Sequence, residues 1–121
     1  ESDLLTVMQA CTNGTLADIQ VKFSDRHACC VILASAGYPE SYQKGYEITM
    51  TDEARAATFV AGAKLDGDKL VTSGGRVTGT TAIADTLEDA IKEAYRLSDG
   101  VKFEGAYRRS DIGQRALQAL K

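Results

Sequence analysis

Several residue types are scarce in this sequence, and each scarcity excludes a class of site. The 121 residues include no tryptophan, one proline, one histidine and three cysteines. One histidine cannot build a histidine-based metal centre, and the adjacent Cys29 and Cys30 would face opposite sides of a strand. An odd cysteine count does not describe a disulfide framework. We therefore expect reduced thiols in a cytoplasmic protein.

Long apolar runs and a strong net charge are also absent. No run approaches the roughly 20 apolar residues that a membrane span needs, and no signal peptide opens the chain. A net charge of −3 gives no electrostatic reason to expect nucleic acid or an anionic membrane as a partner. The apolar fraction of 44% fits one globular domain. Because the chain begins at Glu1 and not at methionine, we interpret it as a processed protein or a fragment.

The familiar catalytic motifs are missing as well. The sequence contains no nucleophile elbow, Walker loop, Cys-x-x-Cys pair or His-Glu-x-x-His motif. Most acidic residues lie on expected helix faces and in turns, where they are usually solvated. The residues by themselves therefore predict no catalytic residue and no metal ligand.

The hydrophobic pattern predicts one strong helix in the middle of the chain and a helix at each end. In the first helix Ser2 is the expected N-cap and Gly14 the expected end. Thr86 and Asp89 resemble a capping box at the start of the strong helix. The first helix has an apolar face but no obvious partner, which suits a remnant of a preceding domain.

Roughly five short strands are expected between and after these helices. Ala28–Ala36 is a continuous apolar run, which is typical of a strand buried on both faces, and Thr51–Arg55 has the composition of a turn. Short turns between successive strands favour an antiparallel or mixed sheet with helices on one side, which is an α+β fold. The other expected strands are Thr58–Lys64, with a bulge or close backbone approach at Gly62, then Lys69–Thr72, Arg76–Ile83 and Val101–Phe103. Asp66-Gly67-Asp68 predicts a turn before Lys69–Thr72.

The turn Ser73-Gly74-Gly75 followed by Arg76 is the first candidate site. Paired glycines let backbone N–H groups approach a ligand, and an arginine offers a forked donor to a carboxylate or phosphate. The alternative is a tight turn followed by a solvated arginine. Arg108 and Arg109, in an expected basic loop over Gly105–Arg109, could belong to the same anion site.

A loop of three tyrosines follows the long apolar strand. Tyr38, Tyr42 and Tyr46 each bring an apolar ring and a polar tip, so that this loop could line a binding surface. The alternative is a loop held against the core by its rings.

Several segments, in the same order, resemble phosphoribosylamine–glycine ligase (glycinamide ribonucleotide synthetase). The likeness covers about residues 28 to 117, and it rests on the whole set because no single segment is specific. The segments are Val31–Pro39, Lys44-Gly45, Phe59–Lys64, Leu70–Val77, Ala94-Tyr95, Phe103–Gly105, Arg108–Gly113 and Arg115-Ala116.

The resemblance implies the carboxy-terminal portion of a ligase with an ATP-grasp core. That family joins glycine to phosphoribosylamine with ATP, through a glycyl phosphate, in de novo purine synthesis. The resemblance places the ATP and magnesium sites in the part of the ligase that precedes Glu1, so that no cofactor is expected on these residues and no activity from them alone. Residues 1–25 would end the ATP-grasp domain. Residues 26–121 would form the carboxy-terminal domain, similar to a barrel-sandwich remnant (a rudimentary single-hybrid fold) with packed helices.

The resemblance also implies roles for individual residues. Gly74 and Gly75 would offer backbone donors, and Arg76 a charge, toward the phosphate of phosphoribosylamine or the carboxylate of glycine. Asp111 and Arg115 are one helical turn apart and could pair, either to close the substrate pocket or as a cap of the last helix, which is expected to open at Ser110 or Asp111. The expected partners are the rest of the ligase chain and these small substrates.

Some positions depart from the family pattern. Glu40 stands where the family usually has glycine, and Ser110 where it has lysine. Val60 and Ala63 replace a histidine and a threonine. Two alternatives therefore stay open, namely the equivalent domain of another ATP-grasp ligase (biotin carboxylase-like or aminoimidazole ribonucleotide carboxylase) and a non-catalytic binding module.

Overall fold

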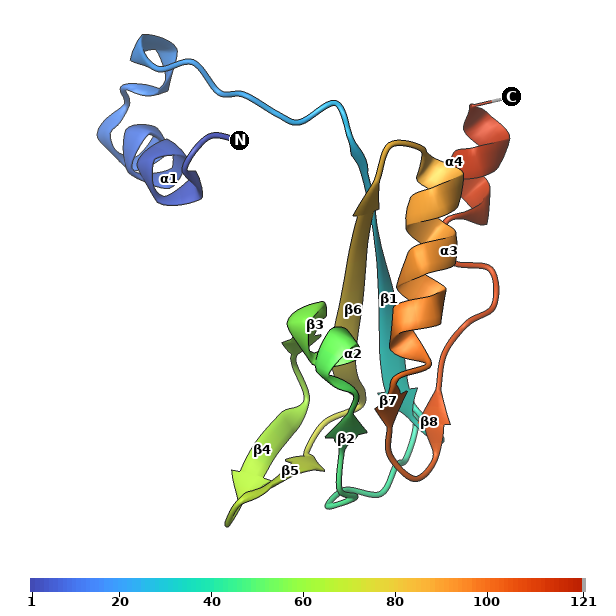
Figure 1. The fold of residues 1–121 in the computed structure, drawn as a ribbon. Coiled ribbons are helices and arrows are strands. Elements are labelled where there is room, and N and C mark those ends of the chain that lie inside the picture. The colour runs from blue at the N-terminus through green and yellow to red at the C-terminus, as the bar shows by residue number, and fades with distance from the viewer. Residues whose placement is uncertain (121) are drawn as a thin grey trace.

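A computed structural model describes residues 1–120 of the chain (Figure 1). Its elements are α1 (Leu4–Asn13), the 3-10 turn η1 (Leu16–Asp18), β1 (His27–Ser35), β2 (Thr49–Met50), α2 (Asp52–Ala56), β3 (Thr58–Val60), β4 (Ala63–Asp66), β5 (Lys69–Thr72), β6 (Arg76–Ala84), α3 (Leu87–Ser98), β7 (Val101–Lys102), β8 (Ala106–Tyr107) and α4 (Gln114–Ala119). No helix among these residues is long and apolar enough to cross a membrane.

The sheets confirm the predicted α+β fold. The main sheet has four strands in the order β3-β6-β1-β8, and β2-β7 and β4-β5 form two-stranded sheets. Every pair of neighbouring strands is antiparallel. Gly67, with φ of 59°, makes the predicted turn between β4 and β5.

The long pair β1–β6 carries one irregularity of register. Leu33 lies opposite Thr78, but Ala34 lies opposite Arg76, so that Val77 is the extra residue of a β-bulge. Val77 is fully buried with Leu33 in a hydrophobic cluster, whereas the neighbouring Arg76 is exposed. On a regular strand Val77 would lie opposite Ala34 and face the open side of the sheet; the extra residue lets Val77 join the core while Arg76 takes the place opposite Ala34.

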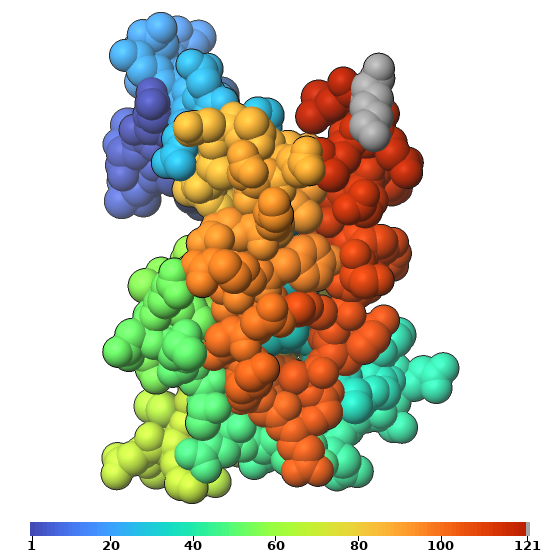
Figure 2. Space-filling view, turned by 45° about the vertical axis from the view of Figure 1, so that its right-hand side comes forward, coloured from blue at the N-terminus to red at the C-terminus, as the bar shows by residue number. Residues whose placement is uncertain are grey.

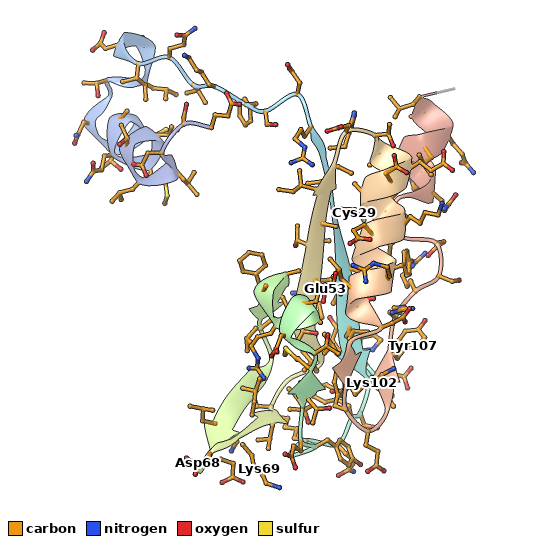
Figure 3. All side chains as sticks on the ribbon, in the orientation of Figure 1. Cys29, Glu53, Asp68, Lys69, Lys102 and Tyr107 are labelled. Carbon is orange, nitrogen blue, oxygen red and sulfur yellow. The ribbon has the colours of Figure 1, made fainter. Side chains whose placement is uncertain are left out.

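Helix α3 covers one face of this pair. Thr86 accepts a hydrogen bond from the Asp89 amide at 3.1 Å, which confirms the predicted N-cap. Ala90 and Ala94 are fully buried, and their small side chains let the helix approach Val31 and Cys29 of β1 (Figures 1 and 3). The prediction that β1 is buried on both faces is wrong, because no helix among residues 1–120 covers its other face.

The side chains along β1 show that the two faces of this strand differ in burial. Cys29 and Val31 are buried, while Cys30 and Ile32 are exposed. The two adjacent cysteines thus face opposite sides of the sheet, as predicted. A continuous apolar run hides such alternation, since residues on the open face of the sheet are apolar as well.

A second cluster fills the space beside α2 and β7, where a turn was predicted over Thr51–Arg55. Thr51 instead caps α2, accepting a hydrogen bond from the Ala54 amide at 3.2 Å, and Ala54 is buried. Glu53 of α2, which Figure 3 labels, accepts hydrogen bonds of 3.1 and 2.5 Å from Arg96 of α3. The threonine cap and the acidic first turn were the sequence signals of this helix.

The expected strand Thr58–Lys64 is two strands, β3 and β4, in different sheets. They separate at Gly62, where a Cβ atom would lie 2.8 Å from the Gly74 Cα and collide with the Arg76 carbonyl oxygen. The close backbone approach predicted for Gly62 is therefore confirmed, and it is the reason why the strand breaks there.

The first 25 residues lie apart from the sheet, at the end of an extended segment (Figure 1). Asp3, not the predicted Ser2, caps α1 by accepting a hydrogen bond from the Thr6 amide at 2.8 Å. Gly14 ends the helix with φ of 71°, as predicted. Ser2 instead accepts a hydrogen bond from the Lys22 amide at 2.7 Å, which closes the segment on itself.

The Thr78 side chain gives a test of the β1–β6 core. Its hydroxyl is buried and has no hydrogen-bond partner within residues 1–120. Because an unsatisfied buried hydroxyl costs roughly 1–3 kcal/mol, we expect Thr78→Val to raise the free energy of unfolding by about 1 kcal/mol in urea denaturation.

Thr80, two residues along the same strand, is the matched control. It is equally buried, but its hydroxyl is 2.9 Å from the Thr58 hydroxyl. Thr80→Val should therefore lower the free energy of unfolding. Equal effects from the two substitutions would contradict the assigned hydrogen bonding.

Candidate functional site

A groove of about 800 Å³ lies beside β1, on the side of the sheet that α3 leaves open. Cys30, Ile32 and Ala34 of β1 line it together with Arg76. Its other walls come from two loops, the turn with Tyr38 and Pro39 and the segment 107–112. The same surface continues into a smaller cavity of about 560 Å³, which shares Ile32, Tyr38 and Arg76 with the groove.

Arg76 is the available cation of this groove. It begins β6, and its side chain is exposed. Within residues 1–120 its guanidinium makes no hydrogen bond or ion pair, in contrast to Arg96, Arg108 and Arg109. Among the arginines that line the groove, it is therefore the one whose charge remains free to meet an anion.

Gly74 and Gly75, the two glycines before Arg76, allow close packing around this turn. The Gly74 amide donates to the Gly62 carbonyl oxygen at 3.0 Å, so the prediction of a free donor there is wrong. A Cβ atom on Gly75 would collide with the ring of Tyr38. The tight-turn alternative accounts for Gly74, and at Gly75 the absence of a side chain makes room for an aromatic wall of the groove.

The Gly75 amide is the second polar group that remains near Arg76. The Gly75 carbonyl accepts a hydrogen bond from the Ser35 amide at 2.8 Å, but within residues 1–120 its own N–H donates none. Gly75 lines the smaller cavity beside Arg76. A guanidinium and a neighbouring amide form the kind of donor set that holds a carboxylate or phosphate.

Asp111 and Arg109 form a pair in the wall of the groove. The Arg109 Nε and Nη2 atoms donate to the two carboxylate oxygens of Asp111 at 2.8 and 2.6 Å. These hydrogen bonds lower the pKa of Asp111 and raise that of Arg109. Arg109 is thus neutralised locally and offers a ligand less charge than Arg76.

The predicted pairing of Asp111 with Arg115 is wrong. The last helix begins at Gln114 after Gly113, which has φ of 84°, so Asp111 neither caps it nor lies one helical turn from Arg115. Arg115 is exposed and lies outside the groove. The left-handed glycine redirects the chain, and sequence spacing alone did not show this.

Arg108 lines the groove, but its guanidinium is already engaged by bonds to Ser98 of α3 and to Asp99 just after it. It donates to the Ser98 hydroxyl at 2.5 Å and to Asp99 at 2.6 Å, and its guanidinium lies 5.1 Å from the centre of the Tyr95 ring. Its role is structural, although the basic loop had suggested an anion contact. Part of that loop is β8, whose Tyr107 pairs with Ala34.

Sequence reasoning missed the floor and one wall of the groove. The apolar run predicts that Cys30 and Ile32 are buried, but both line the groove, and no sequence pattern distinguishes Tyr107. Tyr38, from the tyrosine loop, does line both cavities. The signal available for the floor was the polar Thr81, which lies opposite Cys30 on the partner strand.

A known protein family matches the part of the chain that forms this groove. Residues 28–115 match the model of the family described as phosphoribosylglycinamide synthetase, C domain. The chain belongs to this family. The match covers both long strands, α3 and the whole groove, and leaves α1 outside it.

The sequences of individual relatives align with nearly the whole chain. The phosphoribosylamine–glycine ligase of Clostridium acetobutylicum is 43% identical over 114 residues, covering 94% of this chain and 27% of the relative. The trifunctional purine biosynthetic protein adenosine-3 of Homo sapiens is 42% identical, covering 100% of this chain and 12% of that one. The chain thus spans about a quarter or less of these relatives.

A solved structure whose sequence identity to this chain is similar to that of these relatives also supports the fold. The crystal structure of phosphoribosylamine–glycine ligase from Thermotoga maritima is 44% identical and superposes with a TM-score of 0.66. The superposition covers 70% of this chain and 21% of that one. Since identity is well above the level at which only the fold is shared, sequence and structure support the same family.

The Arg109–Asp111 pair predicts a pH dependence in the groove wall. The lowered pKa means that the pair is complete above the unfolded pKa of about 3.9 and is lost as the pH falls through the folded value. We expect the Asp111 carboxyl resonance to titrate below pH 3.9 in NMR, and Arg109→Gln to return its midpoint toward that value.

Arg115→Gln is the control for this titration. It removes the same charge four residues from Asp111, but Arg115 has no contact with that carboxylate. The midpoint of the Asp111 titration in the Arg115→Gln variant should match the midpoint in the unaltered chain. A midpoint moved by Arg115→Gln and not by Arg109→Gln would contradict the pairing.

Proposed function

We propose that this chain is the carboxy-terminal part of an ATP-dependent ligase that joins glycine to 5-phosphoribosylamine and yields glycinamide ribonucleotide. The observation that carries the proposal is the family match over residues 28–115, together with relatives named phosphoribosylamine–glycine ligase. The match favours this ligase over the two alternatives, a different ATP-grasp ligase or a binding module with no enzymatic context.

Magnesium, which the reaction requires together with ATP, fits poorly on the residues that the structure describes. Within residues 1–120 no group of three or more histidine, cysteine, aspartate and glutamate side chains could hold a metal ion. The carboxylate of the groove is already paired with Arg109. We therefore assign the nucleotide and its metal to the part of the ligase that lies outside this chain, and this domain to one wall of the substrate site.

Within that wall, Arg76 and the Gly75 amide are the groups that would receive an anionic substrate. Both substrates carry the right chemistry, since phosphoribosylamine has a phosphate and glycine a carboxylate. Gly74 would support the turn. Asp111, through Arg109, would close the pocket, whereas Arg115 has no place in it.

The rest of the ligase chain is the partner that the open face of the sheet would meet. Phe59, Ile83 and Tyr107 are 71%, 57% and 56% exposed, and register places them on the same face as Ile32. Apolar patches of this kind mark interfaces. Residues 1–25, outside the family match, would end the preceding ATP-grasp domain, and residues 26–121 would form this one.

The first test compares this chain with the full-length gene product in an assay of ATP- and magnesium-dependent ligation. We expect activity in the full-length protein and none in residues 1–121, because the metal ligands lie outside them. Inactivity of both proteins would contradict the proposed function, and activity of the short chain would contradict the division of labour between the domains.

Arg76 is tested in the full-length protein. If it contacts the phosphate or carboxylate, Arg76→Ala should raise the Michaelis constant for one substrate about 10-fold or more, as expected for a lost charge-assisted hydrogen bond. The exposed Arg55 of α2, which lies outside the groove, supplies Arg55→Ala as the control. Unchanged Michaelis constants and turnover in Arg76→Ala would exclude the contact.

A further inference from the structure

Residues 108–113, here called the strap, form one wall of the groove and have no helix or strand of their own. They connect the short strand β8 to α4. An irregular segment of this length needs partners outside itself for its backbone groups, or it will not hold one conformation. In the space-filling view the strap lies along the side of α3 (Figure 2).

One hydroxyl supplies two of these partners. The Tyr95 hydroxyl donates to the Arg109 carbonyl oxygen at 2.7 Å and accepts from the Ile112 amide at 3.1 Å. These two residues flank Ser110 and Asp111, so that a single group on α3 fixes both ends of the part that faces the groove. Because the hydroxyl acts as donor and acceptor at once, no apolar ring could replace it.

The ends of the strap are held to the same helix. The Arg108 guanidinium lies over the Tyr95 ring and donates to Ser98, one turn further along α3. Gly113 packs against Ile91, one turn earlier, where a Cβ atom would lie 2.7 Å from the Ile91 Cγ1. Tyr95 is thus the middle one of three attachment points spaced along a rigid helix.

We propose that Tyr95 is a positioning residue of the substrate site, which holds the strap so that the Arg109–Asp111 pair shares the groove with Arg76. It acts through the strap and touches no substrate. This inference rests on the proposed function for its catalytic consequence. The link from Tyr95 to the shape of the groove stands on the geometry alone.

The adjacent cysteines report on that shape. Cys30 lies on the floor of the groove, whereas Cys29 is buried beneath α3 on the opposite face. In a Cys11→Ser background, Tyr95→Phe should speed the reaction of Cys30 with a thiol reagent several-fold and leave Cys29 protected. Exchange of the Ile112 amide should quicken about tenfold, as expected for one lost hydrogen bond. Tyr46→Phe, outside the groove, is the control and should change neither rate.

The thiol reactions and the amide exchange can each overturn the inference. Unchanged Cys30 reactivity and Ile112 exchange would show that the hydroxyl does not hold the strap. Exposure of Cys29 as well would show general loosening in place of local positioning. These two measurements use the 121-residue chain and need no enzymatic activity.

The catalytic consequence is measured in the full-length protein. Tyr95→Phe should raise the Michaelis constant for the groove substrate about fivefold and change turnover less than about twofold, because only the bound geometry is altered. Unchanged Michaelis constants with a loosened strap would overturn the positioning role. If the unaltered full-length protein had no ligase activity, the proposed function would fail, and the thiol and exchange results would still decide what Tyr95 does.

Discussion

The pairing of β1 with β6 is the constraint on which the rest of the structure depends. Helix α3 packs on one face of this pair through alanines at the points of closest approach, and small side chains are what allow a helix to lie so near a sheet. The other strands of the main sheet attach to its two edges. Since one face is sealed in this way, the opposite face of the same strands becomes the surface available for function.

Three arginines of this domain are engaged in contacts that hold its own elements together. Arg96 joins α2 to α3, Arg108 joins the strap to α3, and Arg109 is matched by Asp111. Arg76 differs because the chain around it is fixed by backbone contacts and needs nothing from its side chain. A cation kept out of such pairs, beside an aromatic wall, can receive an anion on electrostatic grounds alone.

Local signals predicted the parts of the fold that local interactions determine. The cap at Thr86, the turn at Gly67 and the break at Gly14 each depend on neighbours in sequence, and each is where the pattern placed it. The exposure of Ile32, the partner of Asp111 and the role of Arg108 depend on what packs from a distance. For the candidate site, therefore, the sequence pointed to Arg76, which does line the groove, but could not show which other arginines were already engaged.

The bulge at Val77 has a consequence for how this domain can vary. By the period of two along a strand, the same residues in regular register, without a bulge, would place Val77 opposite Ala34 and exchange the faces of every residue before Thr78. The groove would then receive an apolar side chain and the core a guanidinium. Insertions and deletions should consequently be tolerated in the tip between β4 and β5. They should not be tolerated between Gly74 and Thr78, because the number of residues there determines on which face of the sheet Arg76 lies.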